Sequence, residues 1–489
     1  MAPHTFLWHD YETFGLNTRR DRPSQFAGIR TDADLNEIGE PVMMYCQPAN
    51  DYLPDPTSCL ITGITPQMGL ERGLPEHEFA ARIEALLAKP DTIGVGYNTI
   101  RFDDEVTRHL FWRNLIDPYA REWQNGCGRW DLLDVVRMAY ALRPEGIVWP
   151  RKPDERKPGD ASATRPSFKL EDLTRANGLL HAAAHDALSD VRATIALARL
   201  IRTAQPKLFD FCLGLHKKDR VAAELGLPAS PQTAQPFLHV SGMFGPERGC
   251  TAIMWPLATH PSNKNEILAW DLAFDPSELP LLDLATLRLR LFSKAADLPE
   301  GVQRLPLKSV HLNKSPMVVR KLQTLSPEMA AKWGIDIEVA LKNAEKARAL
   351  PDMSAIWPAL FQREPLAAQD VDEDLYGGFI GNADRRRLNQ LRELSPAELV
   401  LDRTGFDDER LAELLFRYKA RNFADGLSAE ESQRWEAHRA ARLMEGEAGA
   451  RNVDAYLAEL DVLSENADER GEAVLGALYE YAEMVTPEV

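Results

Sequence analysis

The stretch that decides the fold is Thr5-Phe6-Leu7-Trp8-His9-Asp10-Tyr11-Glu12, near the N-terminus. Its first four residues form a short apolar run of the kind found in a buried strand, and the run meets acidic residues at its end. Side chains alternate across a strand, so Asp10 and Glu12 project from the same face. Two carboxylates this close repel unless they are protonated or bridged by a cation, which points to a divalent metal ion. The alternative is an exposed strand end in a turn.

The remainder of residues 1–200 also predicts an α/β fold. Apolar residues at helical spacing predict helices over residues 76–88 and 186–201. Short apolar runs bounded by turn-like residues predict further strands at residues 26–30, 42–46 and 92–95. Residues 150–166 are rich in Pro, Lys, Arg, Asp and Ser, and we expect an exposed, mobile loop there.

Two more acidic elements follow predicted strands or begin predicted helices. Asn98-Thr99-Ile100-Arg101-Phe102-Asp103-Asp104 comes directly after a strand candidate. Its acids could instead complement the amide groups of a helix N-terminus. His185-Asp186-Ala187-Leu188-Ser189-Asp190 opens the long helix, where an N-cap Asp186 beside a surface histidine is the ordinary explanation. Asp190 lies one turn further in and points back towards the helix start, where it could join a metal site.

The order of these elements carries more information than any one of them. Asp-x-Glu, then Asn-x-x-x-Phe-Asp, then His-Asp-x-x-x-Asp resembles the DEDD superfamily of 3′→5′ exonucleases, in its histidine-bearing subgroup. ITGIT (residues 61–65) and SFKLEDL (residues 167–173) are similar to that subgroup too. The closest resemblance is to the bacterial exodeoxyribonuclease I family, and it spans the whole chain through HDYETFG (9–15), RFDDEVTR (101–108), RWDLLDV (129–135), ALRPEGI (141–147), HVSGMFG (239–245) and YKARNF (418–423).

The resemblance implies a two-metal active site. Carried over by position, the metal ligands are Asp10, Glu12, Asp103 and Asp190, with Asp103 preferred to Asp104 because the family motif places the ligand directly after Phe. His185 would accept a proton from the attacking water, which requires a neutral imidazole near physiological pH. The expected ions are two Mg²⁺, which prefer oxygen ligands, with Mn²⁺ as a possible substitute.

A single nucleic-acid strand is usually held by cationic side chains on its phosphates and aromatic rings under its bases. Aromatic and basic residues at helical spacing are more often core and solvated surface, so these contacts rest on fewer observations than the metal site. Lys169 is expected at a terminal phosphate, where the family often has arginine with its bidentate fork. The full set of expected substrate contacts is Glu12, Thr13, Phe14, Arg108, Tyr119, Trp123, Arg137, Arg143, Phe168 and Lys169.

Composition fits this interpretation once charge is examined by region. The chain has 489 residues and a net charge of −17. Residues 1–200 hold 29 acidic and 23 basic side chains (net −6), residues 201–350 hold 15 and 19 (net +4), and residues 351–489 hold 30 and 15 (net −15). The acidity therefore belongs mainly to the last quarter. On charge alone the positive middle segment is an ordinary mixed surface, and it becomes a candidate contact only if the first region handles a polyanion.

The five scattered cysteines, with no CxxC pair, suit free thiols in a reducing cytoplasm. No apolar run is long enough to span a bilayer, and the N-terminus lacks the pattern of a signal peptide. We therefore expect a cytoplasmic protein without membrane contact.

Length and pattern predict three domains. Residues 1–202 would be an α/β nuclease domain with a ribonuclease H-like mixed sheet, residues 203–353 a small SH3-like β-rich domain, and residues 354–489 an all-helical domain. By resemblance the three enclose a groove, which would allow processive digestion of single-stranded DNA in repair and recombination. The acidic helical region would face outward, except for local clusters such as Arg417, Lys419 and Arg421. The family also implies a monomer that docks the C-terminal tail of a single-stranded DNA-binding protein.

Two other functions remain open at this stage. The same active site could act on RNA, since nothing in the metal chemistry reads the sugar 2′-hydroxyl. A catalytically silent module that binds single strands or recruits partners is the other. The complete set of ligand types, together with His185, counts against it.

Overall fold

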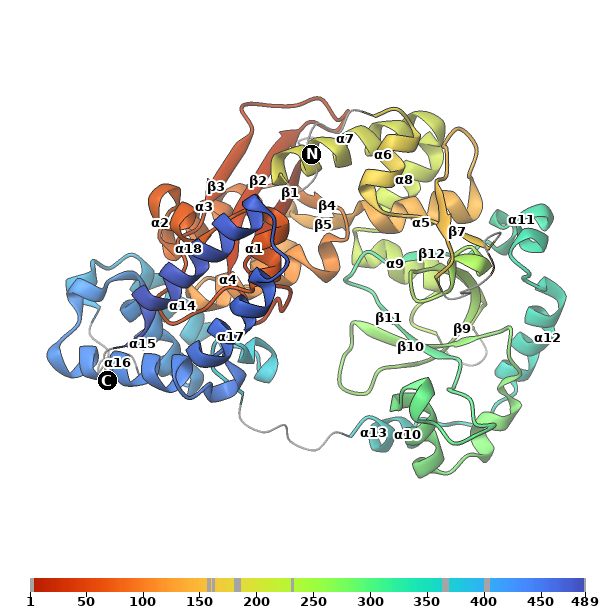
Figure 1. Ribbon diagram of the computed structural model, residues 1–489. Coiled ribbons are helices and arrows are strands. Elements are labelled where there is room, and N and C mark those ends of the chain that lie inside the picture. Colours follow the sequence, from red (N-terminus) through yellow and green to blue (C-terminus); the bar gives the residue numbers. More distant parts are fainter. Residues whose placement is uncertain are drawn as a thin grey trace. The chain divides into compact units, whose positions relative to one another are not determined.

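The computed structural model describes residues 4–155, 160, 163–179, 186–229, 233–362, 369–399 and 405–487. The chain forms two compact units (Figure 1). The first comprises residues 1–128, 181–192 and 366–489, and the second comprises residues 129–180 and 193–365. Within the described ranges, every helix is too short or too polar to cross a membrane.

The first unit is built on a mixed sheet with the strand order β3-β2-β1-β4-β5. Its central strand β1 (Thr5–Thr13) runs antiparallel to β2 (Pro23–Thr31) and parallel to β4 (Thr92–Gly96). The strand β3 (Val42–Tyr45) pairs with β2, and β5 (Gly128–Asp131) falls at the boundary between the units. Since β1 continues to Thr13, the acidic pair of the first motif lies inside the strand and not after it.

Helices α3 (Glu76–Leu87) and α4 (Asp103–Arg113) share a core with this sheet. The predicted helical spacing in α3 is confirmed, because its apolar residues are buried. The core that joins strands and helices contains Leu7, Tyr11, Phe26, Phe79, Ile83, Val106, Leu110 and Phe111. Two short helices, α1 (Pro56–Thr62) and α2 (Pro66–Arg72), precede α3. The α/β prediction for this region is therefore correct.

Five helices of the C-terminal region complete the first unit: α14 (Asn382–Arg392), α15 (Arg410–Asn422), α16 (Ala429–Leu443), α17 (Val453–Ser464) and α18 (Glu469–Val485). Helices α17 and α18 lie side by side (Figure 1). The amphipathic pattern of residues 454–485 is divided between α17 and α18, because Asp468 caps α18 by accepting a hydrogen bond from Gly471 N at 2.8 Å.

Two hydrophobic cores join these helices to the N-terminal part of the same unit. One packs Phe14 and Tyr52 against Tyr456, Leu460 and other residues of α16 to α18. The other packs Trp112 and Leu115 against apolar residues of α14 and α15. The segment after β1 therefore rests on the C-terminal helices.

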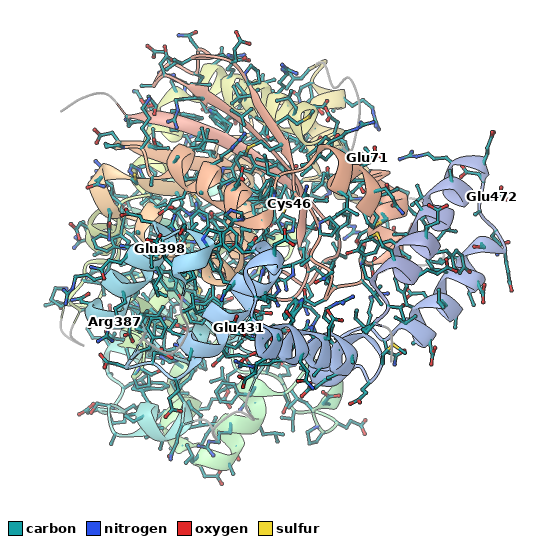
Figure 2. All side chains as sticks on the ribbon, turned by 90° about the vertical axis from the view of Figure 1, so that its left-hand side faces the viewer. Cys46, Glu71, Arg387, Glu398, Glu431 and Glu472 are labelled. Carbon is teal, nitrogen blue, oxygen red and sulfur yellow. The ribbon has the colours of Figure 1, made fainter. Side chains whose placement is uncertain are left out.

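The basic residues Arg417, Lys419 and Arg421, which were expected as exceptions to the outward-facing acidic surface, have buried side chains. Arg417, Lys419 and Arg421 pair with Asp370, Glu431 and Asp51, at 2.8, 2.9 and 2.7 Å between nitrogen and oxygen. Buried charges need partners, and here the partners are acidic residues from other segments of the chain. The exposed charge is largely acidic, as at Glu398 and Glu472 (Figure 2).

The second unit contains a five-stranded sheet with the order β11-β10-β9-β8-β12 and antiparallel neighbours throughout. Its strands are β8 (Phe237–Val240), β9 (Thr251–Thr259), β10 (Glu266–Asp271), β11 (Leu307–His311) and β12 (Met317–Val319). The β-rich prediction is confirmed. Strand β9 contains Pro256, which sits beside a shift in the pairing with β10, where a strand tolerates proline.

The other elements of the second unit are helical, apart from the hairpin β6 (Arg151–Pro153) and β7 (Thr164–Pro166) in the predicted loop. Residues 327–348 form two helices, separated where Gly334 adopts a φ of +60°. Helix α7 (Ala187–Ala204) begins in the first unit and continues in the second. The remaining helices are α5 (Leu132–Leu142), α6 (Leu170–Ala176), α8 (Pro206–Gly214), α9 (Lys218–Leu225), α10 (Leu284–Phe292), α11 (Pro327–Lys332), α12 (Ile337–Arg348) and α13 (Ile356–Leu360).

Candidate active site

Three of the predicted carboxylates converge in the first unit. Asp10 and Glu12 project from one face of β1, and Asp190 reaches them from the first turn of α7. Each offers an oxygen atom, and these atoms lie within 4.8 Å of one another. The strand supplies two ligands at a two-residue spacing and the helix supplies the third, so residues far apart in sequence meet in one acidic group.

Asp103 is the first residue of α4 and is almost completely buried. Its Oδ1 accepts a hydrogen bond from the backbone N–H of Tyr11 at 3.1 Å. Tyr11 lies between Asp10 and Glu12 in the sequence, so this contact places the Asp103 carboxylate beside the acidic pair of β1. Asp103 is not one of the three residues that share the 4.8 Å group, but its charge acts directly on Asp10.

The electrostatics of the group favour a cation. Burial raises the pKa of Asp10 well above its usual value, and the charges of Asp103, Glu12 and Asp190 raise it further. Burial also raises the pKa of Glu12 to about 7, with smaller contributions from Asp190 and Asp186. Carboxylates that resist ionisation together are stabilised by a divalent ion, and their hard oxygen atoms are suitable ligands for one. The donor set therefore fits a metal site.

The start of α7 confirms one alternative suggested by the sequence and leaves another untested. Asp186 caps the helix, because its Oδ2 accepts a hydrogen bond from Ser189 N at 3.2 Å. Asp186 is therefore the cap of this motif, and Asp190 is the residue of the motif that joins the acidic group on β1. His185 lies outside the described residues, and its role as proton acceptor stays a prediction.

A second layer of charge lies behind Asp103. Asp104, the next residue, accepts a hydrogen bond from Arg121 Nη2 at 2.6 Å, and both side chains are buried. His9 of β1 is also fully buried. Its burial and the nearby Arg121 cation lower the pKa of His9 to about 4, so this imidazole is neutral at physiological pH.

Two expected substrate contacts at the end of β1 are turned inward. Thr13 is buried, and its hydroxyl donates to the backbone oxygen of Gly15 at 2.7 Å. Phe14 is 1% exposed and belongs to the core shared with α16 to α18. A substrate could therefore reach the backbone of this segment more easily than these two side chains.

The expected contacts on and after α4 differ in exposure. Arg108 is buried, and its guanidinium donates to both carboxylate oxygens of Glu122, at 2.7 and 2.9 Å. The same guanidinium lies over the ring of Tyr119, 5.2 Å from the ring centre. Trp123 is 65% exposed and could stack on a base without any rearrangement. Of these, Tyr119 and Trp123 are the better placed for a strand.

Four expected contacts lie in the second unit. Arg137 pairs with Asp134 at 2.6 Å, and Arg143 donates to the backbone oxygen of Thr324 at 2.9 Å. Phe168 packs edge-on against Tyr140, with ring centres 5.2 Å apart. Lys169 is exposed immediately before α6. The roles of these four residues remain predictions.

Sequence reasoning overlooked an aromatic pair in the C-terminal region of the first unit. Phe379 is 86% exposed and lies against Tyr119, with ring centres 6.1 Å apart. Tyr376, in the short helix η8 (Asp374–Gly377), contacts Arg108 and Glu105 through its hydroxyl. The two glycines between these aromatics were the available signal, since such a stretch, Tyr-Gly-Gly-Phe, cannot build an ordinary helical core.

Comparison with known proteins agrees with this geometry. A family model described as "Exonuclease" matches residues 7–198. Models of the exonuclease I SH3-like domain and the exonuclease I C-terminal domain match residues 216–363 and 369–485. Exodeoxyribonuclease I of Escherichia coli is 47% identical over 485 residues, which is 98% of each chain. The chain belongs to the exodeoxyribonuclease I family.

Other members give the same result. The exodeoxyribonuclease I of Haemophilus influenzae is 44% identical over 481 residues, 98% of each chain. Exonuclease I from Methylocaldum szegediense superimposes with a TM-score of 0.90 at 46% identity, covering 99% of both chains. A zinc-bound E. coli ExoI–ssDNA complex gives 0.90 at 45% identity with 99% coverage of both, and an ExoI/SSB-Ct complex gives 0.89 at 45% with 99% and 100% coverage.

The three family models give the architecture of the chain. The chain has the mixed α/β exonuclease domain, the SH3-like domain and the helical C-terminal domain of exodeoxyribonuclease I. The acidic group on β1 and α7, with Asp103 of α4 beside it, lies within the exonuclease match, where the family's metal site is expected from the sequence motifs.

Proposed function

We propose that this protein is a processive 3′→5′ exonuclease that hydrolyses single-stranded DNA to 5′-mononucleotides. The observation that carries the proposal is the group formed by Asp10, Glu12 and Asp190, with ligand atoms within 4.8 Å and Asp103 beside it. The raised pKa values of Asp10 and Glu12 indicate a site built to be neutralised by cations. Full-length similarity to exodeoxyribonuclease I supports the choice of reaction.

The proposed metal ions are two Mg²⁺, with Mn²⁺ as a possible substitute, held by Asp10, Glu12, Asp103 and Asp190. Bound there, they would polarise the scissile phosphate and lower the pKa of a water molecule. Oxygen-only ligands suit Mg²⁺, which borrows phosphate and water to fill its shell. The zinc-bound form of the E. coli complex supports a metal site in this family without identifying the ion used by this chain.

His185 is the proposed general base. It immediately precedes the cap residue of α7, and Asp190 lies on that helix five residues later. A neutral imidazole in this position would take a proton from the attacking water. The carboxylates themselves would be occupied as ligands, which leaves the imidazole as the proton acceptor among the motif residues.

We further propose that Tyr119, Trp123 and Phe379 form an aromatic surface for the bases in the first unit. Trp123 and Phe379 are exposed, and Tyr119 contacts Phe379. A cation accompanies two of these rings, since Arg385, which pairs with Asp117 at 3.3 Å, lines the same cavity as Tyr119 and Phe379. Aromatic stacking with neighbouring cations holds any base sequence, as an exonuclease requires.

The proposed contacts in the second unit are Arg137, Arg143, Phe168 and Lys169, with Lys169 at a phosphate. We propose domain boundaries at residues 1–202, 203–353 and 354–489. Participation of the positively charged middle domain in strand binding would keep the strand attached between cuts, which is the physical basis of processivity. Five buried cysteines, all free, support action in the reducing cytoplasm.

Digestion of end-labelled oligonucleotides tests the proposed reaction. One DNA sequence would be offered as a single strand, as a duplex and as RNA, with Mg²⁺ or with EDTA. We expect mononucleotides from the 3′ end of the single DNA strand, little product from the duplex or RNA, and none in EDTA. Equal cleavage of RNA would indicate a broader nuclease. Metal-independent binding without cleavage would indicate a silent binding module.

The second unit also contains a candidate pocket for the implied partner tail. A cavity of about 670 Å³ is lined by apolar side chains that include Leu142, Phe211 and Val319. Its charged lining residues are the cations Arg143, Lys207, Arg220, Arg320 and Lys321 and the single acid Glu224. A pocket lined by apolar and mainly cationic side chains suits an acidic peptide with an apolar terminal residue. The ExoI/SSB-Ct complex of the similar structure supports a partner of this kind.

Binding of a short acidic peptide with a free carboxyl terminus would test this pocket. Fluorescence anisotropy should show binding that weakens with salt and that is lost in Lys207→Glu or Lys321→Glu. The matched control is Lys342→Glu, a cation of the same unit that does not line the cavity. Equal affinity of all variants would exclude the pocket without affecting the nuclease proposal.

A further inference from the structure

A buried ion pair joins two functional segments of the first unit. Asp104 Oδ1 and Arg121 Nη2 are 2.6 Å apart, and each side chain is only 1% exposed. Asp104 directly follows the predicted metal ligand Asp103 at the start of α4. Arg121 lies in the short helix η2 (Ala120–Glu122), between the two aromatic residues proposed to stack on bases, Tyr119 and Trp123. The pair thus connects a metal ligand with a base-binding segment.

A second ion pair joins the same two segments one turn further along α4. Arg108 Nε and Nη2 donate to Glu122 Oε1 and Oε2 at 2.7 and 2.9 Å. A bidentate guanidinium–carboxylate pair fixes orientation as well as distance. Because Arg121 and Glu122 are adjacent, two consecutive residues of η2 are attached to two successive turns of α4. The segment is therefore unable to slide or turn relative to the helix without breaking a buried ion pair.

The Arg121 guanidinium also rests against the central strands. A Cβ atom placed on Gly94 of β4 would lie 3.4 Å from Arg121 Nη1 and 3.5 Å from His9 Cε1. No oxygen or nitrogen atom among the described residues accepts a hydrogen bond from Arg121 Nε or Nη1. Asp104 is thus the carboxylate that compensates this buried cation at hydrogen-bond distance. A buried cation that loses its carboxylate partner is strongly disfavoured, so the pair holds η2 in one position.

We propose that Asp104 and Arg121 are positioning residues, which fix the distance between the bases held by Tyr119 and Trp123 and the metal ligand Asp103. This inference rests on the proposed function. A strand seated on the aromatic residues is then placed with its scissile phosphate at the metal site. Breaking the pair leaves the aromatic residues able to bind the strand, but the strand no longer meets Asp103 in the reactive geometry. Turnover falls while affinity is kept.

The test compares Asp104→Asn, Arg121→Gln and the double variant with the wild type. The measurements are kcat and KM on an oligonucleotide, the half-saturating Mg²⁺ concentration, and the affinity for the strand in EDTA. The matched control is Glu76→Gln, which removes the carboxylate from the buried pair Arg113–Glu76 at the other end of α4 (3.0 Å). Thermal unfolding of each variant separates loss of folding from loss of positioning.

We expect Asp104→Asn to lower kcat by about 10- to 100-fold and to raise the half-saturating Mg²⁺ concentration severalfold, since small misplacements at a reacting centre are costly. Strand affinity in EDTA should stay within about twofold of the wild-type value. The kcat of the double variant should be no lower than that of the less active single variant, because both substitutions break the same ion pair. Glu76→Gln should keep kcat within about twofold while lowering the unfolding temperature.

The proposal is overturned if Asp104→Asn keeps its kcat, if KM alone changes, if the two single effects multiply in the double variant, or if Glu76→Gln lowers kcat equally. Should Asp104→Asn fail to fold, Arg121→Lys would be tested in its place. This variant keeps the buried positive charge but replaces the planar guanidinium with a single ammonium group. It must show the same selective loss of kcat, in smaller measure, and a normal kcat there overturns the proposal. An inactive wild type, by contrast, would reject the proposed function itself and is seen before any variant is made.

Discussion

The backbone N–H of Tyr11 donates a hydrogen bond to Oδ1 of Asp103 over 3.1 Å. Strand β1 therefore carries Asp10 and Glu12 on one face and orients the side chain of Asp103 through its backbone. Asp190 completes the group from the start of α7. The site is assembled from a central strand and the first turns of two helices, so its geometry depends on rigid elements and not on loops.

The first prediction concerns the carboxylates as metal ligands. Asp10→Asn keeps the size of the side chain but removes a charged ligand, and kcat should fall by roughly a thousandfold or more because transition-state stabilisation by the metals is lost. Affinity for a single strand in EDTA should change little. Steady-state hydrolysis and anisotropy measure the two effects. Asp34→Asn, at an exposed turn, should behave as the wild type.

A second prediction concerns stability without metal. The pKa of Glu12 is about 7 in the folded protein against 4.5 for an ordinary glutamate. Ionising it therefore costs folded-state free energy, and the metal-free protein loses stability as pH rises from about 4.5 to 7. In EDTA at pH 8, Glu12→Gln should raise the free energy of unfolding by about 1–3 kcal/mol. Below pH 4.5 the two proteins should unfold alike.

Urea unfolding at several pH values measures this effect. The matched control is Glu71→Gln on α2, a glutamate that is exposed on the surface (Figure 2). A destabilised Glu12→Gln at pH 8 would mean that Glu12 is already compensated by protein groups. The electrostatic argument for a cation would then fail.

A third prediction concerns the pH dependence of metal binding. The pKa values of Asp10 and Glu12 are both raised, so protons must leave before a cation binds. Metal affinity should fall as pH decreases through about 7, by roughly tenfold per unit for each proton displaced. Calorimetric titration with Mn²⁺ in buffers of different ionisation enthalpy counts those protons. Fewer than one proton released at pH 6.5 would contradict the assigned ligands.

The sequence predicted which carboxylates lie together because their positions are tied to local patterns. The Asp10 and Glu12 pair follows from strand alternation, and the first turn of a helix distinguishes the cap Asp186 from Asp190, which points towards the pair. The extent of β1 was less predictable. The polar residues in its second half, including the acidic pair, are typical of the end of a strand. Only the pairing of β1 with β2 and β4 shows that it is a central strand of the sheet.

Surface contacts were harder to foresee, since exposure is a property of tertiary packing. Arg417 and Arg421 read as a local basic cluster, yet acids from distant segments pair with them in the interior. Phe14 read as a substrate contact, yet the C-terminal helices cover it. Phe379 was passed over, although it is among the most exposed aromatic side chains described. Each of these features depends on packing partners far away in sequence.

A fourth prediction concerns the aromatic surface. Trp123→Ala and Phe379→Ala should each weaken single-strand affinity, by about 1–3 kcal/mol if one base is stacked on the ring. The Mg²⁺ concentration needed for half-maximal rate should be unchanged, because neither residue is attached to the carboxylates. Phe274→Ala, an exposed aromatic of the second unit, serves as the control. Unaltered affinity in both variants would remove these rings from the strand path.

A fifth prediction concerns His185, whose role comes from the sequence motif. His185→Ala should lose most turnover, by about 100-fold or more, as expected when a general base is removed. It should still bind the strand and two metal ions. Oligonucleotide digestion and Mn²⁺ titration on the same preparation measure both properties. Equal rates for variant and wild type would leave the attacking water without an assigned proton acceptor.

The most direct test of the central claim is crystallographic. Crystals of the full-length wild-type protein would be soaked with Mn²⁺ and a 3′-terminal nucleotide, and the anomalous signal of manganese would be mapped. The account predicts two peaks among Asp10, Glu12, Asp103 and Asp190, about 3.5–4 Å apart, with the phosphate between them. Occupied manganese sites elsewhere, with these four carboxylates uncoordinated, would contradict it.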